Sequence, residues 1–290
     1  MKKLMSAALV VALTAGCGLF EPKPADGDGG GAQQGEQPQA QGGGVDPTTF
    51  VQAPGRVPVC SDAKVGWMAE RTIKAEGSPQ DLVESYAVVA ETGDSWLIES
   101  RSPTIDAMAS SFPALEGALM GLTVRKADGV VTKAVMGKPG EAGKEIKITP
   151  AGDSPATTAD EGAPDRVTIG IGTFDAVKYV RGETTSWAGT SGETQGVLLK
   201  SQGGGQDYEL AAAPKMATQD VGGVSVSTIE TAYTNGMKMW MTDNEIIACI
   251  LGGGAGADGK RTGQFRTESG GTVIAVTGLR TDAAPQLVWE

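Results

Sequence analysis

The chain has 290 residues with 24 Lys and Arg against 35 Asp and Glu, a formal net charge of −11, and no histidine. An acidic chain without a basic stripe cannot replace the counterions of a phosphate backbone, which argues against nucleic-acid binding. The absence of histidine excludes Ser-His-Asp and Cys-His nucleophiles, imidazole general bases and the usual zinc ligand sets. We therefore expect a protein that is not an enzyme.

Residues 1–16 have the pattern of an export signal. Lys2 and Lys3 precede an apolar run over residues 4–13, which is too short to span a bilayer, and small residues lead up to Cys17. This segment resembles the lipobox of bacterial lipoproteins. The resemblance implies that the chain is cut before Cys17 and that Cys17 is diacylated. The alternative is an ordinary signal peptide that contains a cysteine.

A diacylated Cys17 would hold the protein stably on a membrane, since two acyl chains suffice for lasting attachment. The residue after it is Gly18 rather than aspartate. In Gram-negative lipoproteins, this resemblance favours the outer membrane, facing the periplasm. The expected localisation is the cell envelope, with lipidated Cys17 as the link to the membrane.

Residues 17–48 are predicted to form a disordered tether. They are rich in Gly, Gln, Pro and Ala, and such a stretch buries too little apolar surface to offset its ordering entropy. Removal of residues 1–16 leaves a charge of (24 − 2) − 35 = −13. The folded part is then expected over residues 49–290.

Within 49–290, short β-branched or aromatic runs alternate with turn signals, which predicts strands. The expected strands cover residues 65–74, 85–90, 96–100, 119–126, 130–136, 145–149, 167–181, 197–200, 208–211, 224–228, 237–241, 245–251, 264–267 and 272–277. Ala127-Asp128-Gly129 indicates a hairpin turn between two of them. Gly170 and Gly172 suggest a bulge within 167–181.

One segment departs from this β pattern. Apolar residues recur there at spacings of three and four, which predicts a helix covering one face of a sheet; they are Ile105, Met108, Phe112, Leu115, Leu119 and Leu122. Ser102 or Thr104 is the expected cap, and Pro113 is expected to kink or split the helix. Residues 149–165 lack any apolar period, so they separate two possible lobes, 49–150 and 166–290.

Two cysteines remain after Cys17. Export would place Cys60 and Cys249 in an oxidising compartment, where a pair is expected to be bridged. The alternative is two unrelated buried thiols.

Met237, Met239 and Met241 fall on one face of a predicted strand. Thioethers in a row could fill a core, line an acyl pocket or bind copper(I). Gly254-x-Gly256-x-x-Gly259 satisfies a dinucleotide fingerprint, but no helix is expected after it to receive a phosphate. We expect no nucleotide, metal or other cofactor.

Together these patterns predict a mainly β fold, an antiparallel curved sheet or half-barrel with one or two short helices on one face. The exported start, Val65-Gly-Trp-Met-Ala-Glu70 and Gly172-Thr-Phe-Asp-Ala176 resemble periplasmic lipoproteins of the LolA/LppX-like class. That resemblance implies a half-barrel holding acyl chains under its helices. The β domain would then bind a lipid or other apolar ligand, in a pocket lined by Ile105, Met108, Phe112, Leu115, Leu119, Met237, Met239 and Met241. The alternative is a non-catalytic structural or interaction lipoprotein with a filled core.

Overall fold

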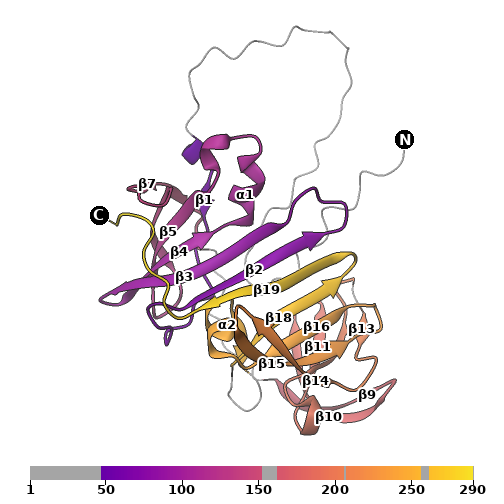
Figure 1. Ribbon diagram of the computed structural model, residues 1–290. Helices are drawn as coiled ribbons and strands as arrows, with labels where there is room; N and C mark the ends of the chain where they lie inside the picture. Colours follow the sequence, from indigo (N-terminus) through magenta and orange to yellow (C-terminus); the bar gives the residue numbers. More distant parts are fainter. Residues whose placement is uncertain (1–46, 152–161, 206, 256–260, 290) are drawn as a thin grey trace, which may run out of the picture.

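The computed structural model describes residues 47–151, 162–205, 207–255 and 261–289 (Figure 1). Within these ranges the chain is mainly β, with antiparallel sheets that curve but stay open, and two α-helices. The predicted fold class is therefore confirmed.

The largest sheet has 12 strands and combines two parts of the chain that are distant in sequence. Its order is β14-β15-β16-β18-β19-β2-β3-β4-β5-β6-β7, with β17 paired to β18. The strands are β2 (Met68–Ala75), β3 (Leu82–Thr92), β4 (Ser95–Arg101), β5 (Leu119–Arg125), β6 (Val131–Gly137), β7 (Lys144–Glu145), β14 (Lys215–Val221), β15 (Val224–Ala232), β16 (Lys238–Thr242), β17 (Gly253–Ala255), β18 (Arg261–Ser269) and β19 (Thr272–Arg280).

The two parts meet where β19 pairs with β2. Thr272 lies opposite Ala75 and Arg280 opposite Met68, so the pairing runs along both strands. The two possible lobes, 49–150 and 166–290, thus contribute strands to the same sheet, side by side in Figure 1.

Two smaller sheets complete the β structure of the described ranges. The five-stranded sheet has the order β13-β12-β11-β10-β9, and a parallel pair joins β1 to β8. These strands are β1 (Gln52–Ala53), β8 (Lys147–Ile148), β9 (Ala163–Ile169), β10 (Gly172–Arg181), β11 (Thr184–Gly189), β12 (Leu198–Gln202) and β13 (Tyr208–Glu209).

The helices are α1 (Pro103–Ala109) and α2 (Glu245–Ile250), with short 3-10 turns η2 (Pro47–Thr49), η3 (Pro113–Leu115) and η4 (Gly192–Thr194). Both α-helices lie on the same face of the main sheet, because Ile105 of α1 and Ile247 of α2 belong to one buried cluster. We call it the main cluster; it includes Ile98 of β4 and Phe265 of β18.

The segment of residues 51–63 packs on the same face of the sheet as these helices. It contributes Val51, Ala53, Val57, Val59 and Ala63 to the main cluster, and its backbone N–H at Val57 donates to Gly129. The face that the sheet presents to its helices is therefore covered by the chain itself.

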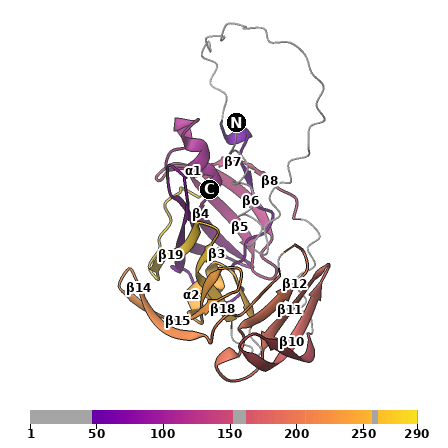
Figure 2. The ribbon, with the colours of Figure 1, turned by 90° about the vertical axis from the view of Figure 1, so that its right-hand side faces the viewer.

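A second apolar cluster joins the five-stranded sheet to the main one. We call it the small cluster; its buried members are Val167, Ile169, Ala176, Val197, Leu199, Leu210, Tyr233 and Met237. Leu210 pairs with Tyr233, and the N–H of Ala211 donates to the carbonyl of Ala232, so β13 is fastened to the end of β15. Figure 2 shows the five-stranded sheet at the end of the molecule opposite α1.

The predicted helix over 105–122 is corrected in its extent. The helix α1 ends at Ala109, Pro113 begins the separate turn η3, and Leu119 and Leu122 lie in β5. Pro113 splits the segment because proline lacks the N–H that a continuing helix would need. Ser102 occupies the N-cap position of α1 but makes no side-chain cap hydrogen bond.

The predicted strand over 245–251 is wrong, because these residues form α2. The side chain of Asn244 accepts hydrogen bonds from the N–H groups of Ile246 and Ile247, at 3.1 and 3.2 Å. Such a cap satisfies two N–H groups that a free helix start leaves unpaired. The apolar run of residues 245–251 predicted a strand, although the helix cap Asn244 directly precedes it.

Residues 167–181 form a hairpin instead of one bulged strand. Gly172 pairs with Ile169, so Gly170 and Ile171 make a two-residue turn between β9 and β10. The predicted hairpin around Ala127-Asp128-Gly129 is confirmed, with Val124 opposite Val131. Gly129 has a φ of 70°, a conformation that favours glycine.

Candidate functional site

The two cysteines predicted to pair are bridged. Cys60 lies before β2 and Cys249 on α2, with Cα atoms 5.0 Å apart, and the N–H of Cys60 donates to the carbonyl of Cys249. The carboxylate of Asp62 lies beside the two sulfurs, but sulfurs bonded to each other offer no thiolate to a metal. Cys17 lies outside the described residues, so its lipidation stays a prediction.

The helical half of the predicted pocket lies on the main cluster. Ile105 and Leu115 are fully buried there, and Met108 and Phe112 pack against it while remaining partly exposed. The first four side chains therefore pack with other core residues. Leu119 is half-buried at the start of β5 and lies on the face of that strand opposite Met120 and the main cluster.

The methionine half of the predicted pocket lies elsewhere. Met237 is 2% exposed in the small cluster, Met239 packs against that cluster, and Met241 lies opposite Ile229 of β15. Trp240 between them faces the other way, into the main cluster, with the guanidinium of Arg266 5.3 Å from its ring. The sheet therefore separates the two halves of the predicted pocket, which do not meet.

The two best-defined hollows among the described residues are open and partly polar. The larger, of about 400 Å³, lies beside the β9–β10 turn and is lined by Ile171 and Phe174, but also by Arg166, Asp175 and Glu193. An apolar ligand of drug size needs a site of ~300–1,000 Å³ that is mostly hydrophobic and encloses most of its surface. The volume suffices for such a ligand, whereas the charged and open lining does not suit it.

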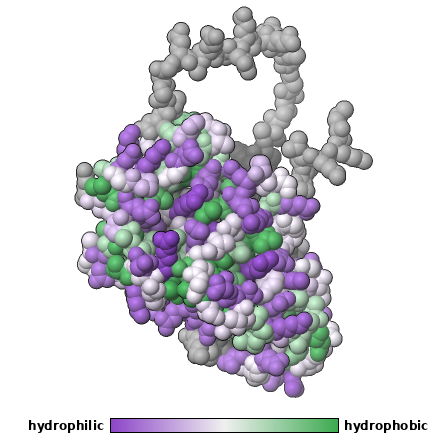
Figure 3. Space-filling view, viewed as in Figure 1, coloured by the Kyte–Doolittle hydropathy of each residue, from purple (hydrophilic) through white to green (hydrophobic). Residues whose placement is uncertain are grey.

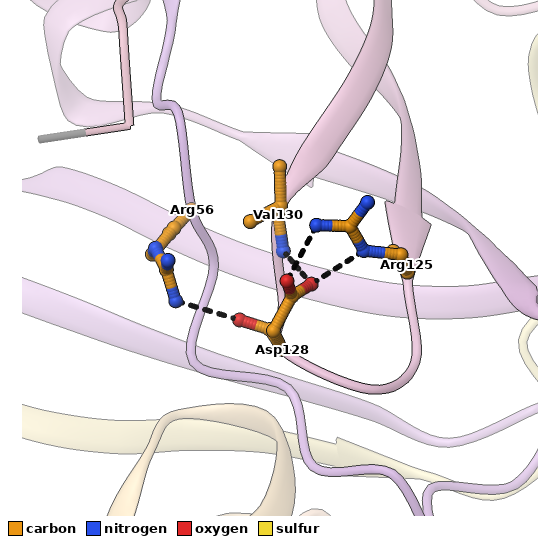
Figure 4. A network of polar contacts seen from close by, with 4 residues as sticks. All are labelled: Arg56, Arg125, Asp128 and Val130. Atoms are coloured by element: carbon orange, nitrogen blue, oxygen red, sulfur yellow. Dashed lines mark hydrogen bonds and ion pairs between the residues drawn. The ribbon is translucent and has the colours of Figure 1, made fainter. Parts of the chain in front are cut away.

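The second hollow, of about 280 Å³, lies between the segment before Cys60 and the β5–β6 turn. Asp128 organises this turn (Figure 4): Arg125 donates to both of its carboxylate oxygens, at 2.9 and 2.5 Å, and the N–H of Val130 donates at 3.2 Å. The hydrogen bond from Arg125 is the main reason that the pKa of Asp128 falls to about 2. Arg56 donates to the carbonyl oxygen of Asp128, which ties the turn to the segment beside it.

Glu99 of β4 is the most buried carboxylate in the described part of the chain, and no sequence pattern pointed to it. It is 4% exposed and accepts hydrogen bonds from the N–H groups of Gln286 and Leu287 and from the indole of Trp289. It lies on the face of β4 opposite Ile98 and the main cluster, since side chains alternate along a strand. The C-terminal segment of residues 281–289 crosses that face, as Figure 1 shows.

Glycine gives this C-terminal segment the space it needs. Gly121 pairs with Glu99 across β4 and β5, and a Cβ atom there would lie 2.9 Å from Trp289 and 3.1 Å from Leu287. The Glu99 site is therefore built to hold the protein's own chain. A glutamate within a strand and a small residue opposite it carry no sequence signal for such a role.

A second carboxylate–indole pair lies on the five-stranded sheet. The indole N–H of Trp187 donates to Asp165 at 2.8 Å, and this bond is the main cause that lowers the pKa of Asp165. The ammonium groups of Lys178 and Lys200 lie 5.6 and 5.9 Å from the Trp187 ring. Burial raises the pKa of Tyr233 to about 12 in the neighbouring small cluster.

On the face shown in Figure 3, hydrophobic and hydrophilic side chains are interspersed. In the described part of the chain, no helix is long and apolar enough to cross a membrane. Comparison of the chain with protein-family models, with curated proteins and with solved structures finds no match.

Proposed function

We propose that the protein is a non-catalytic lipoprotein of the bacterial envelope, held on its membrane through Cys17, whose β domain is a structural or interaction module. The filled interior is the observation that carries this proposal. Six of the eight residues expected to line one acyl pocket lie in or against two separate clusters, each packed with other side chains: Ile105, Met108, Phe112 and Leu115 at the main cluster, and Met237 and Met239 at the small cluster. This arrangement supports a filled core over an enclosed lipid site.

The four described groups with a shifted pKa do not favour a role in acid–base catalysis. A general acid or base works best when its pKa lies near the operating pH. The shifted groups here move the other way: the pKa values of Asp128 and Asp165 fall, and those of Tyr233 and Arg125 rise. None of these four groups is thereby prepared for proton transfer at neutral pH.

Metabolic labelling tests the anchor. Cells expressing the full chain would be grown with an alkyne fatty acid, and the Cys17→Ser variant would serve as the control. We expect label on the mature wild-type chain and none on the variant. Equal labelling of both chains, or of neither, would contradict the anchor.

Native mass spectrometry of the same full chain, released in mild detergent, tests the filled core. We expect the mass of the acylated polypeptide alone. A noncovalent lipid bound at one per chain, and retained as the detergent is diluted, would instead favour a lipid-binding β domain.

A further inference from the structure

One end of the molecule, where the described chain begins, carries an exposed phenylalanine stacked on a partly buried one. Phe50, directly after η2, is 57% exposed, and its ring stacks on that of Phe112 with centroids 6.2 Å apart. Met108 of α1 is partly exposed on the same side of the main cluster. Figures 1 and 2 both show η2 beside α1 at this end. We call Phe50, Phe112 and Met108 the Phe50–Phe112 surface.

The two segments that form this surface contain no charged residue. Residues 47–55 and 107–115 are free of Asp, Glu, Lys and Arg in a chain of which 20% is charged. The nearest acid on α1, Asp106, forms an ion pair with Arg101 at 3.1 Å. These two segments therefore take no charge of their own out of water, and burying a charge is the costly part of moving protein into an apolar medium. Charged side chains stand at their edges, such as Lys147 opposite Gln52 and Glu116 after Leu115.

We propose that the Phe50–Phe112 surface lies in the interfacial layer of the bilayer to which Cys17 is attached. This placement rests on the proposed function, because it requires the lipid anchor. The chain between Cys17 and Pro47 has 46 − 17 = 29 residues, which their composition predicts to be a disordered tether. A disordered chain of that length would have an end-to-end distance of ~30 Å.

Because the predicted tether is short, a weak contact between the Phe50–Phe112 surface and lipid is enough to keep this surface on the bilayer. A short flexible linker gives an effective concentration of order mM, so the surface needs only modest affinity for lipid. Aromatic side chains are favoured at the boundary between headgroups and acyl chains. The surface is also the part of the domain next to the point where the attachment enters it.

The two large apolar side chains that are more exposed than Phe50 are less well placed. Met216 on β14 is 74% exposed and Val180 on β10 is 61% exposed, but these strands lie at the end opposite α1 in both ribbon views. The acidic net charge makes an anionic bilayer repulsive, so the lipid expected at the surface is zwitterionic.

Tryptophan fluorescence tests the placement. The acylated full chain carrying Phe50→Trp would be reconstituted into phosphatidylcholine vesicles with brominated acyl chains, which quench tryptophan on contact. The matched control carries Met216→Trp, at an exposed position of the opposite end. After subtraction of the wild-type signal, we expect the added emission of the Phe50→Trp chain to fall at least twofold. The added emission of the Met216→Trp chain should stay unchanged.

The mass of each preparation separates the two ways in which the test can fail. A diacylated chain whose Phe50→Trp signal is not quenched overturns the placement and leaves the anchor intact. A chain that carries no acyl group overturns the anchor and the placement with it. Quenching that persists in the Cys17→Ser, Phe50→Trp double variant would also contradict the proposal, because the contact would then not depend on attachment.

Discussion

The carboxylate of Glu99 accepts a hydrogen bond of 2.8 Å from the backbone N–H of Leu287, a residue 188 positions further along the chain. Glu99 also accepts from the N–H of Gln286 and the indole of Trp289, so one buried side chain satisfies three donors of the C-terminal segment. An acceptor that serves several buried donors contributes more than a single hydrogen bond, since its removal leaves each donor unpaired.

Replacement of Glu99 by glutamine should therefore destabilise the fold. Glutamine keeps the shape but presents an NH₂ group where donors already point, so we expect a loss of ~1–3 kcal/mol in the free energy of unfolding. Urea denaturation followed by circular dichroism measures it. Glu91→Gln is the control: the Glu91 side chain is 55% exposed in its ion pair with Lys126, so this change should alter stability by less than ~0.5 kcal/mol. Equal stability of Glu99→Gln and the wild type would contradict the role given to Glu99.

Leu287 and Val288 offer a matched pair in the C-terminal segment. Leu287 is 4% exposed against Gly121 and Gly137, while Val288 next to it is 49% exposed. Leu287→Ala should cost ~2–4 kcal/mol because it leaves a cavity, and Val288→Ala should cost less than ~0.5 kcal/mol. Similar urea midpoints for the two variants would show that the segment does not pack as described.

The disulfide closes a loop with a sequence separation of 189. In the chain-entropy model, a loop this long stabilises by ~5 kcal/mol. Replacing both Cys60 and Cys249 by serine should lower the unfolding free energy by about that amount. Reductant should shift the wild-type urea midpoint and leave that of the double variant unchanged; a wild-type midpoint insensitive to complete reduction would contradict the prediction.

The Asp128 turn should make stability depend on pH at the acidic end. The pKa of Asp128 is lowered in the folded state from its ordinary 3.8 to about 2, so its charged form stabilises the fold. That contribution is complete above pH ~4 and is lost as the pH falls toward 2. The stability difference between wild type and Asp128→Asn should therefore be constant above pH ~4 and shrink below it.

Carboxyl titration by NMR checks the cause of that shift. Arg125 donates the hydrogen bond that lowers the pKa of Asp128 most. Arg125→Gln should therefore move the titration of Asp128 back toward its usual range. An unchanged titration would mean that the ion pair is not what holds this pKa down.

Local patterns predicted the hairpin at Asp128 well, because an Asp-Gly turn between two β-branched runs depends on neighbouring residues alone. The same reasoning failed at residues 245–251, where an apolar run suits a buried strand and a buried helix equally. The cap at Asn244 decides between them, together with the packing of Ile247 and Cys249 into the main cluster. The strands β11 and β14 were missed because Thr, Ser and Gln give them little apolar period.

The predicted pocket shows the limit of such reasoning more clearly. Spacing placed Ile105 and Met108 on one helical face, and Met237 and Met239 on one strand face, but it could not say whether those faces meet. The pairing of β19 with β2 and the position of the five-stranded sheet place the helical face and the methionine face in different clusters. Pairing between distant strands is not encoded in the period of either strand.

The sequence by itself determined the composition-level facts: an acidic chain without histidine, a mainly β pattern, and two cysteines able to pair. These follow from residue types and from spacings of a few residues, for which local physical chemistry suffices. Only the tertiary structure decided that the sheet's interior is filled and that Glu99 holds the C-terminal segment. Both depend on contacts between residues more than a hundred positions apart. A local sequence pattern cannot identify such distant partners.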